Sequence, residues 1–124
     1  MYNYFMLIGT VCKDVEMKEL ADGKRVVSLV LATSKPFPGP DGTRGTDFFN
    51  ISLWEFLADQ ANETLKQGSR VAIKGRILPK LVTLESGARI YVNELIGERL
   101  MDIYPRYEAP ENLEQANIEP KEEE

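Results

Sequence analysis

The stretch that decides the fold occupies residues 46–55 and reads TDFFNISLWE. It is rich in β-branched and aromatic residues and alternates with a period of two, which predicts a β-strand. Successive side chains on a strand point to opposite faces, so we expect Phe49, Ile51 and Leu53 to face a core. The opposite face is polar except for one aromatic ring near each end, and it comprises Phe48, Asn50, Ser52 and Trp54.

Two rings on an otherwise polar face indicate a surface that is displayed rather than buried. Burial would take the side chains of Asn50 and Ser52 out of water without giving them partners. Phe48 and Trp54 could then stack on unpaired bases, or they could pack under a loop or in a subunit interface, where aromatic residues are common. This stretch alone does not separate the two interpretations.

The composition suits one globular domain. The chain has 124 residues, 43% of them hydrophobic, and no apolar run approaches the roughly 18 residues that a membrane span needs. Its start, MYNY, lacks the basic residues and cleavage site of a signal peptide. Cys12 is the only cysteine and histidine is absent, which excludes disulfides, cysteine-based zinc sites and Ser–His or Cys–His catalysis within the chain. We therefore expect a cytoplasmic protein without a cofactor.

The net charge of −5 is unevenly distributed along the chain. Residues 108–124 contain seven Glu and one Lys, a balance of −6, whereas residues 1–107 contain 14 Lys and Arg against 13 Asp and Glu, a balance of +1. The acidity belongs to the end of the chain and does not exclude polyanion binding by the rest. From residue 105 the sequence is also poor in apolar residues, so we expect a folded domain at 1–104 and a disordered acidic tail at 105–124.

Hydrophobic patterning predicts the other elements. We expect strands at residues 4–15, 25–33, 70–84 and 88–102, a helix at 56–67 and a flexible loop rich in Pro and Gly at 34–45. An Asp-Gly pair at 22–23 predicts a hairpin before the second strand. Lys66 and Gly68 predict the last turn and the C-terminal cap of the helix. The first strand is apolar on both faces, so we expect it to be buried in a barrel or a subunit contact, with Cys12 as a core or interface residue.

The order of these elements is three strands, a helix and two strands. This is the plan of an OB-fold, an all-β Greek-key barrel of five strands. Gly9 and Gly75 interrupt the first and fourth strands and predict the bends that closing a barrel requires. Pro79 predicts that the far part of the fourth strand is an edge or an extended arm. A β-sandwich is the main alternative, but it usually contains more strands.

Taken together and in order, several segments resemble the bacterial single-stranded DNA-binding protein family. They are NYFMLIGTV at 3–11 followed by DVE at 14–16, LVLATS at 29–34, TDFFNISLW at 46–54, and LKQGSRV at 65–71 leading to KGRI at 74–77. Val15 stands where the family usually has Pro. The last segment is the most specific, and the similarity extends over about residues 3–104.

The resemblance implies a non-catalytic protein that coats single-stranded DNA, usually as a homotetramer, with a dimer as the alternative. By position it makes Phe48 and Trp54 base-stacking residues, with Phe37 in the loop in a similar role. The family often has a further stacking ring on the fourth strand, where residues 80–82 of this chain are Lys-Leu-Val. Family tails end in an apolar tip that recruits repair and replication enzymes. This chain ends EPKEEE, so we do not expect recruitment of that kind.

We therefore expect a protein of DNA replication, recombination or repair that binds single-stranded DNA without sequence preference. Bases would stack on aromatic rings, and cations would attract phosphates, with affinity falling as salt rises because counterions are released. The candidate rings are Phe37, Phe48, Trp54 and Tyr91, and the candidate cations are Lys35, Arg44, Lys74, Arg76, Lys80 and Arg89. Tyr91 could stack on a base or cap the core.

Two other functions stay open at this point. The domain could be a protein-interaction subunit of a primosome-like assembly, with Phe48 and Trp54 in the interface. A metal-dependent nuclease built from carboxylates is less favoured, because the acidic residues of the central region show no tight pairing on one face. These residues are Asp41, Asp47, Glu55 and Asp59. We expect neither a metal site nor an enzyme.

Overall fold

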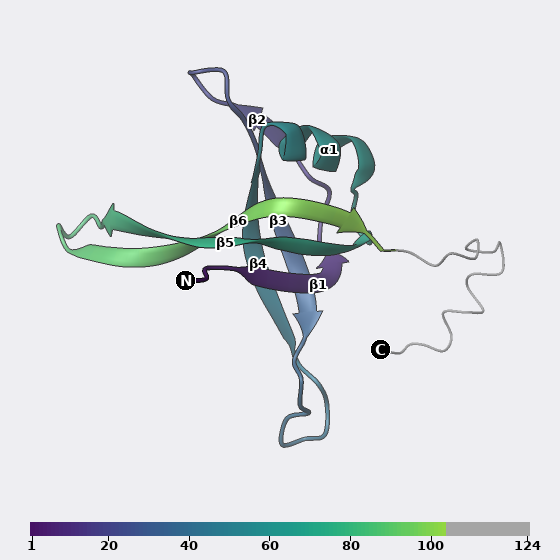
Figure 1. Ribbon diagram of the computed structural model, residues 1–124. Helices are drawn as coiled ribbons and strands as arrows, with labels where there is room; N and C mark the ends of the chain where they lie inside the picture. The colour runs from purple at the N-terminus through teal and green to yellow at the C-terminus, as the bar shows by residue number, and fades with distance from the viewer. Residues whose placement is uncertain (104–124) are drawn as a thin grey trace.

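A computed structural model describes residues 1–103 of the chain. The disordered acidic tail predicted for 105–124 lies outside the described residues. In chain order the elements are β1 (Phe5–Val11), β2 (Met17–Glu19), β3 (Arg25–Ser34), β4 (Thr46–Trp54), α1 (Phe56–Thr64), β5 (Arg70–Thr83) and β6 (Arg89–Asp102). Figure 1 shows α1 beside the β2–β3 hairpin, and the far halves of β5 and β6 extending away from the other strands as an arm.

Five of the strands close into a barrel. The sheet order is β1-β5-β6-β4-β3-β2, and β1 pairs with β3 as well as with β5, so β1, β5, β6, β4 and β3 form a ring. All neighbours are antiparallel except β4 and β6, which pair in parallel at Ile51–Leu95 and Ser52–Ile96. The predicted OB-fold with its single helix is confirmed. The short β2, which patterning did not predict, adds a sixth strand along the edge of β3.

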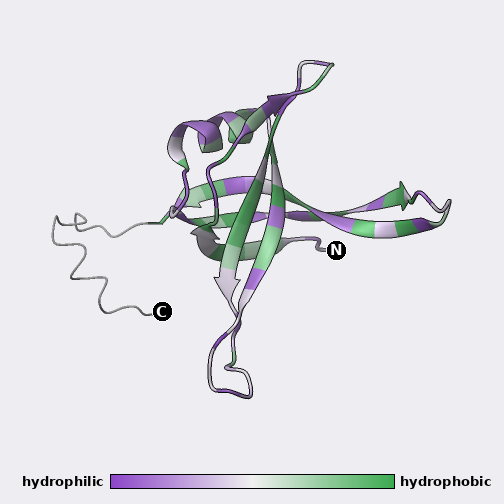
Figure 2. Cartoon of the chain, turned by 180° about the vertical axis from the view of Figure 1, so that it is seen from behind, coloured by the Kyte–Doolittle hydropathy of each residue, from purple (hydrophilic) through white to green (hydrophobic). Residues whose placement is uncertain are grey.

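The core consists of the residues that alternate inward along the barrel strands. Ile51 and Leu53 are fully buried and Phe49 is half-buried, so the predicted inner face of β4 is confirmed. The other members of the core cluster are Val11, Val27, Leu29, Leu31, Ala58, Ala61, Leu65, Val71, Ile73 and Leu100. Hydrophobic and hydrophilic positions alternate along the strands (Figure 2). Helix α1 contributes only Ala58 and Ala61 as buried residues, so it closes one end of the barrel with small side chains.

Both predicted bends coincide with close approaches between strands. A β-carbon at Gly9 would lie 2.3 Å from the carbonyl oxygen of Ala32, and one at Gly75 would lie 1.9 Å from that of Ile96. At Gly9, β1 is about to change partner, because Thr10 pairs with both Arg70 of β5 and Ala32 of β3. At Gly75 the register of β5 and β6 shifts by a bulge. Any other residue at these points would push apart the strands that the barrel must bring together.

The first strand is shorter than predicted and less buried. It ends at Val11 rather than at residue 15, because its pairing with β5 stops at Thr10 and its backbone bonding to β3 goes no further than the hydrogen bond from the Cys12 N–H to the Val30 carbonyl. The predicted Asp-Gly hairpin at 22–23 is present and joins β2 to β3. Met6 and Ile8 are 46% and 54% exposed, so burial of both strand faces within one barrel is wrong. Cys12 is half-buried and unpaired.

The helix also ends earlier than predicted, at Thr64 rather than at residue 67. Leu65 is already extended and turns its side chain into the core. The Lys66 N–H donates to the Ser69 hydroxyl, and the two N–H groups after it bond to the end of β1 and the segment that follows it: Gln67 donates to the Asp14 carboxylate and Gly68 to the Val11 carbonyl. Lys66 and Gly68 therefore belong to the turn that leads into β5, because tertiary hydrogen bonds replace those of another helical turn.

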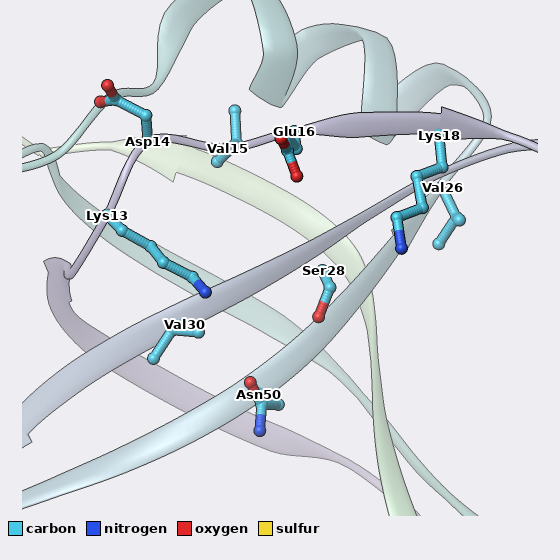
Figure 3. A pocket seen from close by; sticks show the side chains of 9 residues that line it. All are labelled: Lys13, Asp14, Val15, Glu16, Lys18, Val26, Ser28, Val30 and Asn50. Atoms are coloured by element: carbon cyan, nitrogen blue, oxygen red, sulfur yellow. The ribbon is translucent and has the colours of Figure 1, made fainter.

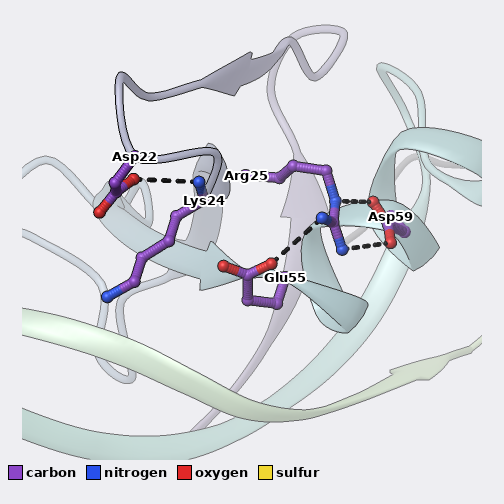
Figure 4. Close-up of polar contacts among 5 residues, drawn as sticks. All are labelled: Asp22, Lys24, Arg25, Glu55 and Asp59. Atoms are coloured by element: carbon purple, nitrogen blue, oxygen red, sulfur yellow. Dashed lines mark hydrogen bonds and ion pairs between the residues drawn. The ribbon is translucent and has the colours of Figure 1, made fainter.

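One arginine ties α1 and the residue before it to the start of β3. Arg25, at the start of β3, donates two hydrogen bonds to the Asp59 carboxylate, from Nε to Oδ1 at 2.8 Å and from Nη2 to Oδ2 at 2.9 Å. Its Nη1 lies 3.2 Å from Oε1 of Glu55, the residue between β4 and α1 (Figure 4). Hydrogen bonding from Arg25 lowers the pKa of Asp59. Both carboxylates are therefore engaged in holding the helix.

Candidate nucleic-acid interface

The displayed face of β4 is continued by β3. Strand pairing sets a small residue of β3 beside each displayed residue of β4: Ala32 beside Phe48, Val30 beside Asn50, Ser28 beside Ser52 and Val26 beside Trp54. Because these neighbours are small, the two rings are not covered from β3. Phe48 is 66% exposed and Trp54 is half-buried. The predicted display of the ring on Phe48 is confirmed, and Trp54 is partly accessible.

A groove lies over the same face (Figure 3). It has a volume of about 630 Å³ and runs between the β3–β4 surface and the segment at residues 13–18 that leads into β2. The side chains of Lys13 and Lys18 extend from this segment toward the strands that carry Ser28 and Asn50. The remaining lining residues are Asp14, Val15, Glu16, Val26 and Val30. The lining charges are balanced, with two cations and two carboxylates. The valine side chains and the two hydrogen-bonding side chains, Ser28 and Asn50, suit a ligand that is flat and polar at its edges.

A carboxylate links β4 to the arm on this face. Ser52 Oγ donates to Glu94 Oε2 at 2.7 Å, and Lys80 Nζ lies 3.2 Å from Glu94 Oε1. The Ser52 hydrogen bond, with a smaller contribution from Lys80, lowers the pKa of Glu94. Glu94 is therefore ionised at neutral pH, and it holds the ammonium group of Lys80, whose side chain is otherwise 53% exposed.

Most of the other predicted cations have partners within the chain. Lys35 forms an ion pair with Asp47, and Arg76 Nε lies 3.2 Å from Glu98 Oε2. Lys74 Nζ lies 5.4 Å from the centre of the Tyr4 ring, on the β1 side of the barrel. Arg44 donates to the carbonyl oxygens of Lys35 and Pro36 and so braces the loop at 34–45. Arg89 begins β6 at the tip of the arm, and no ion pair in the described part of the chain includes it.

The structure brings together only part of the predicted site. Phe48, Trp54 and Lys80 converge on one face, and Phe37 is exposed on the loop that continues β3 and β4. Tyr91 pairs with Leu81 on the arm, so it lies on the face of that two-stranded ribbon opposite to Lys80. Tyr91 is also exposed, which rules out its alternative role as a cap on the core.

Three residues that sequence reasoning missed lie on or over this face: Lys13, Lys18 and Glu94. The alternating small residues of β3 suit close packing as well as an accessible groove, so they do not by themselves predict one. Nothing local shows that residues 13–18 cross over it, because that path depends on β2 pairing with β3. The sequence did not point to Glu94 for a similar reason, since its contact with Ser52 depends on the pairing of β4 with β6.

The carboxylates weighed as a nuclease centre do not converge. Asp41 accepts hydrogen bonds from the backbone and hydroxyl of Thr43 within the loop, which lowers its pKa, and Asp47 pairs with Lys35. Glu55 and Asp59 bind Arg25 at the other end of β4. Among residues 1–103, no cluster of three or more acidic or cysteine side chains could hold a metal ion.

The chain belongs to the single-strand binding protein family, whose sequence profile matches residues 2–102. It is 32% identical over 111 residues to single-stranded DNA-binding protein B of Bacillus subtilis, covering 88% of this chain and 98% of that protein. It is 31% identical over 106 residues to the single-stranded DNA-binding protein of Halalkalibacterium halodurans, covering 86% of this chain and 63% of that longer protein. The fold is similar to that of a Plasmodium falciparum SSB in complex with ssDNA, with a TM-score of 0.71 and 22% identity over 84% of this chain and 97% of that one.

In the part of the chain that the structure describes, no helix has both the length and the apolar character needed to cross a membrane.

Proposed function

We propose that this protein binds single-stranded DNA without sequence preference and protects it during replication, recombination or repair. The observation that carries the proposal is the β3–β4 face. It displays the ring of Phe48 and part of Trp54 beside a groove lined by Lys13 and Lys18, in a chain of the single-strand binding protein family. Stacked rings and nearby cations are the features that bind bases and phosphates whatever their sequence.

The proposed path of the strand follows this face. Bases would stack on Phe48 and Trp54, with Phe37 at the loop end and Tyr91 reached only where the strand turns around the arm. Lys13, Lys18 and Arg89 are among the cations that form no ion pair within the described residues, and phosphates would be drawn first to these three. The paired or braced cations Lys35, Arg44, Lys74 and Arg76 would contribute by exchanging partners.

Titration with oligo(dT) is expected to quench the fluorescence of Trp54, the single tryptophan of the chain. A base stacked on the ring deactivates its excited state, and the effect should weaken as salt rises because each phosphate contact releases counterions. We would measure the quench at low and high salt. Duplex DNA of the same length serves as the control, since its bases are not free to stack. Binding of oligo(dT) without quenching would remove Trp54 from the site, and absence of binding in an independent assay would overturn the function.

We also propose that the protein acts as a homo-oligomer, with a tetramer favoured over a dimer. The outer side of β1 is apolar and uncovered in the single chain, because Tyr4, Met6 and Ile8 are about half exposed in one row beside β5. Such a row on a strand is a surface that a second copy can cover.

Replacing Ile8 by glutamate is expected to shift the protein toward monomers. In the proposed contact between two copies the new carboxylate would be removed from water without gaining a hydrogen-bonding or charged partner, which destabilises the contact. Sedimentation velocity over a range of concentrations would measure the shift. Leu20→Glu is the matched control, since Leu20 is similarly exposed (41%) but lies in the β2–β3 turn. An unchanged sedimentation coefficient for Ile8→Glu would place any contact elsewhere.

The bacterial relatives named above are DNA-binding proteins by name. Bacterial DNA lies in the cytoplasm, and we propose that compartment for this chain. We propose a binding role without catalysis, because the surface described here offers stacking and charge rather than a reactive centre.

A further inference from the structure

A negative charge is fixed in the middle of the surface that the proposed function assigns to a polyanion. Glu94 is held by the Ser52 hydroxyl at 2.7 Å and by the Lys80 ammonium at 3.2 Å. Its side chain is 22% exposed, whereas the other carboxylates that form ion pairs in the described chain are 38–51% exposed. Glu94 is therefore the most enclosed of these carboxylates, and it lies on the one face where an acid opposes binding.

The position of Glu94 on this face follows from strand pairing. Ser52 of β4 pairs in parallel with Ile96 of β6, and Glu94 lies two residues earlier on the same side of β6. Ser52 in turn lies between Asn50 and Trp54 on the displayed side of β4. A strand that stacks on both Phe48 and Trp54 must pass this carboxylate.

Lys80 is consequently not a free cation for phosphate. A phosphate that approaches its ammonium group meets the ionised Glu94 at the same point, so the two anions compete for one charge. A base, which is neutral and carries N–H donors on its edge, meets no such penalty beside a carboxylate. The arrangement therefore favours bases over phosphates at this position.

We propose that Glu94 limits the affinity of this surface for single-stranded DNA by holding Lys80 in an internal ion pair, so that the strand passes here with bases rather than phosphates toward the protein. This inference rests on the proposed function. The competing explanation is purely structural: Glu94 joins β4 to the arm and has no effect on binding beyond keeping the strands in place.

Replacing Glu94 by glutamine tests the two explanations, because the side-chain amide oxygen can still accept from Ser52 while the charge is lost. We expect oligo(dT) to bind about 1.5- to 5-fold more tightly at low salt, the range of a single exposed ion pair. The slope of log K against log salt should steepen by about 0.7, the value for one additional phosphate contact on a single strand. Glu94→Ala, which removes the charge and the hydrogen bond together, is expected to change both quantities in the same direction.

The double variant Glu94→Gln with Lys80→Gln is expected to lose the gain, because the phosphate contact depends on the freed Lys80 ammonium. Glu63→Gln is the matched control for net charge, since Glu63 is exposed on α1 away from this face. An equal gain in Glu63→Gln, or an unchanged affinity and salt slope in Glu94→Gln and Glu94→Ala, would overturn the role of Glu94 while leaving the proposed function intact. Failure of the unsubstituted protein to bind oligo(dT) would overturn both.

Discussion

Replacing Phe48 by alanine is expected to weaken oligo(dT) binding by about 5- to 150-fold. This range corresponds to the loss of one base–aromatic stack, about 1–3 kcal/mol. Phe48 is 66% exposed and pairs with Ala32 of the neighbouring strand β3. The ring therefore contributes little to the core, and its removal is expected to take away stacking surface without unfolding the barrel. The effect would be measured by fluorescence anisotropy of a labelled oligonucleotide at fixed salt.

Phe56→Ala is the matched control for this prediction. Phe56 is 75% exposed, but it lies at the start of α1 beyond the end of the β4 face. Its replacement should leave the affinity within about twofold, the scale of a surface change away from a site. An equal loss of oligo(dT) affinity in the two variants would mean that Phe48 contributes only nonspecific apolar surface and not a specific base stack. A Phe48→Ala variant that binds normally and retains its thermal midpoint would exclude this ring from the DNA path.

Replacing Gly97 by alanine is expected to destabilise the fold by about 1–3 kcal/mol, the usual cost of inserting a methyl group into a packed core. A β-carbon at Gly97 would lie 2.4 Å from Cδ2 of Leu53 and 3.3 Å from Cγ2 of Ile73. Both neighbours are fully buried, so neither can move into solvent. Urea denaturation at one fixed protomer concentration would measure the change, because oligomerisation makes stability depend on concentration.

The sharper test combines this change with Leu53→Ala. Alone, Leu53→Ala should cost about 2–5 kcal/mol, because it leaves a cavity at a fully buried site. In the double variant the new methyl group at position 97 enters the space that Leu53 Cδ2 has left. We therefore expect the double variant to be more stable than the sum of the single changes by about 0.5–3 kcal/mol. Strict additivity would show that the barrel relaxes around position 97 and that the two residues are not packed as described.

Much of the architecture was determined locally. The period-two alternation of residues 46–55 placed Ile51 and Leu53 inside and Phe48 outside, because a strand with a buried face permits only one register. Gly9 and Gly75 marked the close approaches of the barrel, since only a residue without a side chain fits 2.3 and 1.9 Å from a carbonyl oxygen. Pro79 correctly marked an arm, where the missing N–H costs little.

The sequence by itself thus determined the barrel, its order of elements and the displayed face of β4, because these depend on alternation and chain geometry. Only the tertiary structure decided where α1 ends, since the N–H groups of Gln67 and Gly68 bond to Asp14 and Val11, which lie far earlier in the sequence. It alone also decided which charges lie free on the displayed face of β4. Whether Lys80 is free or paired depends on Glu94, and their contact arises from the pairing of β6 with both β4 and β5. A charged residue shows its type in the sequence, but its partner is set by the strands that folding brings beside it.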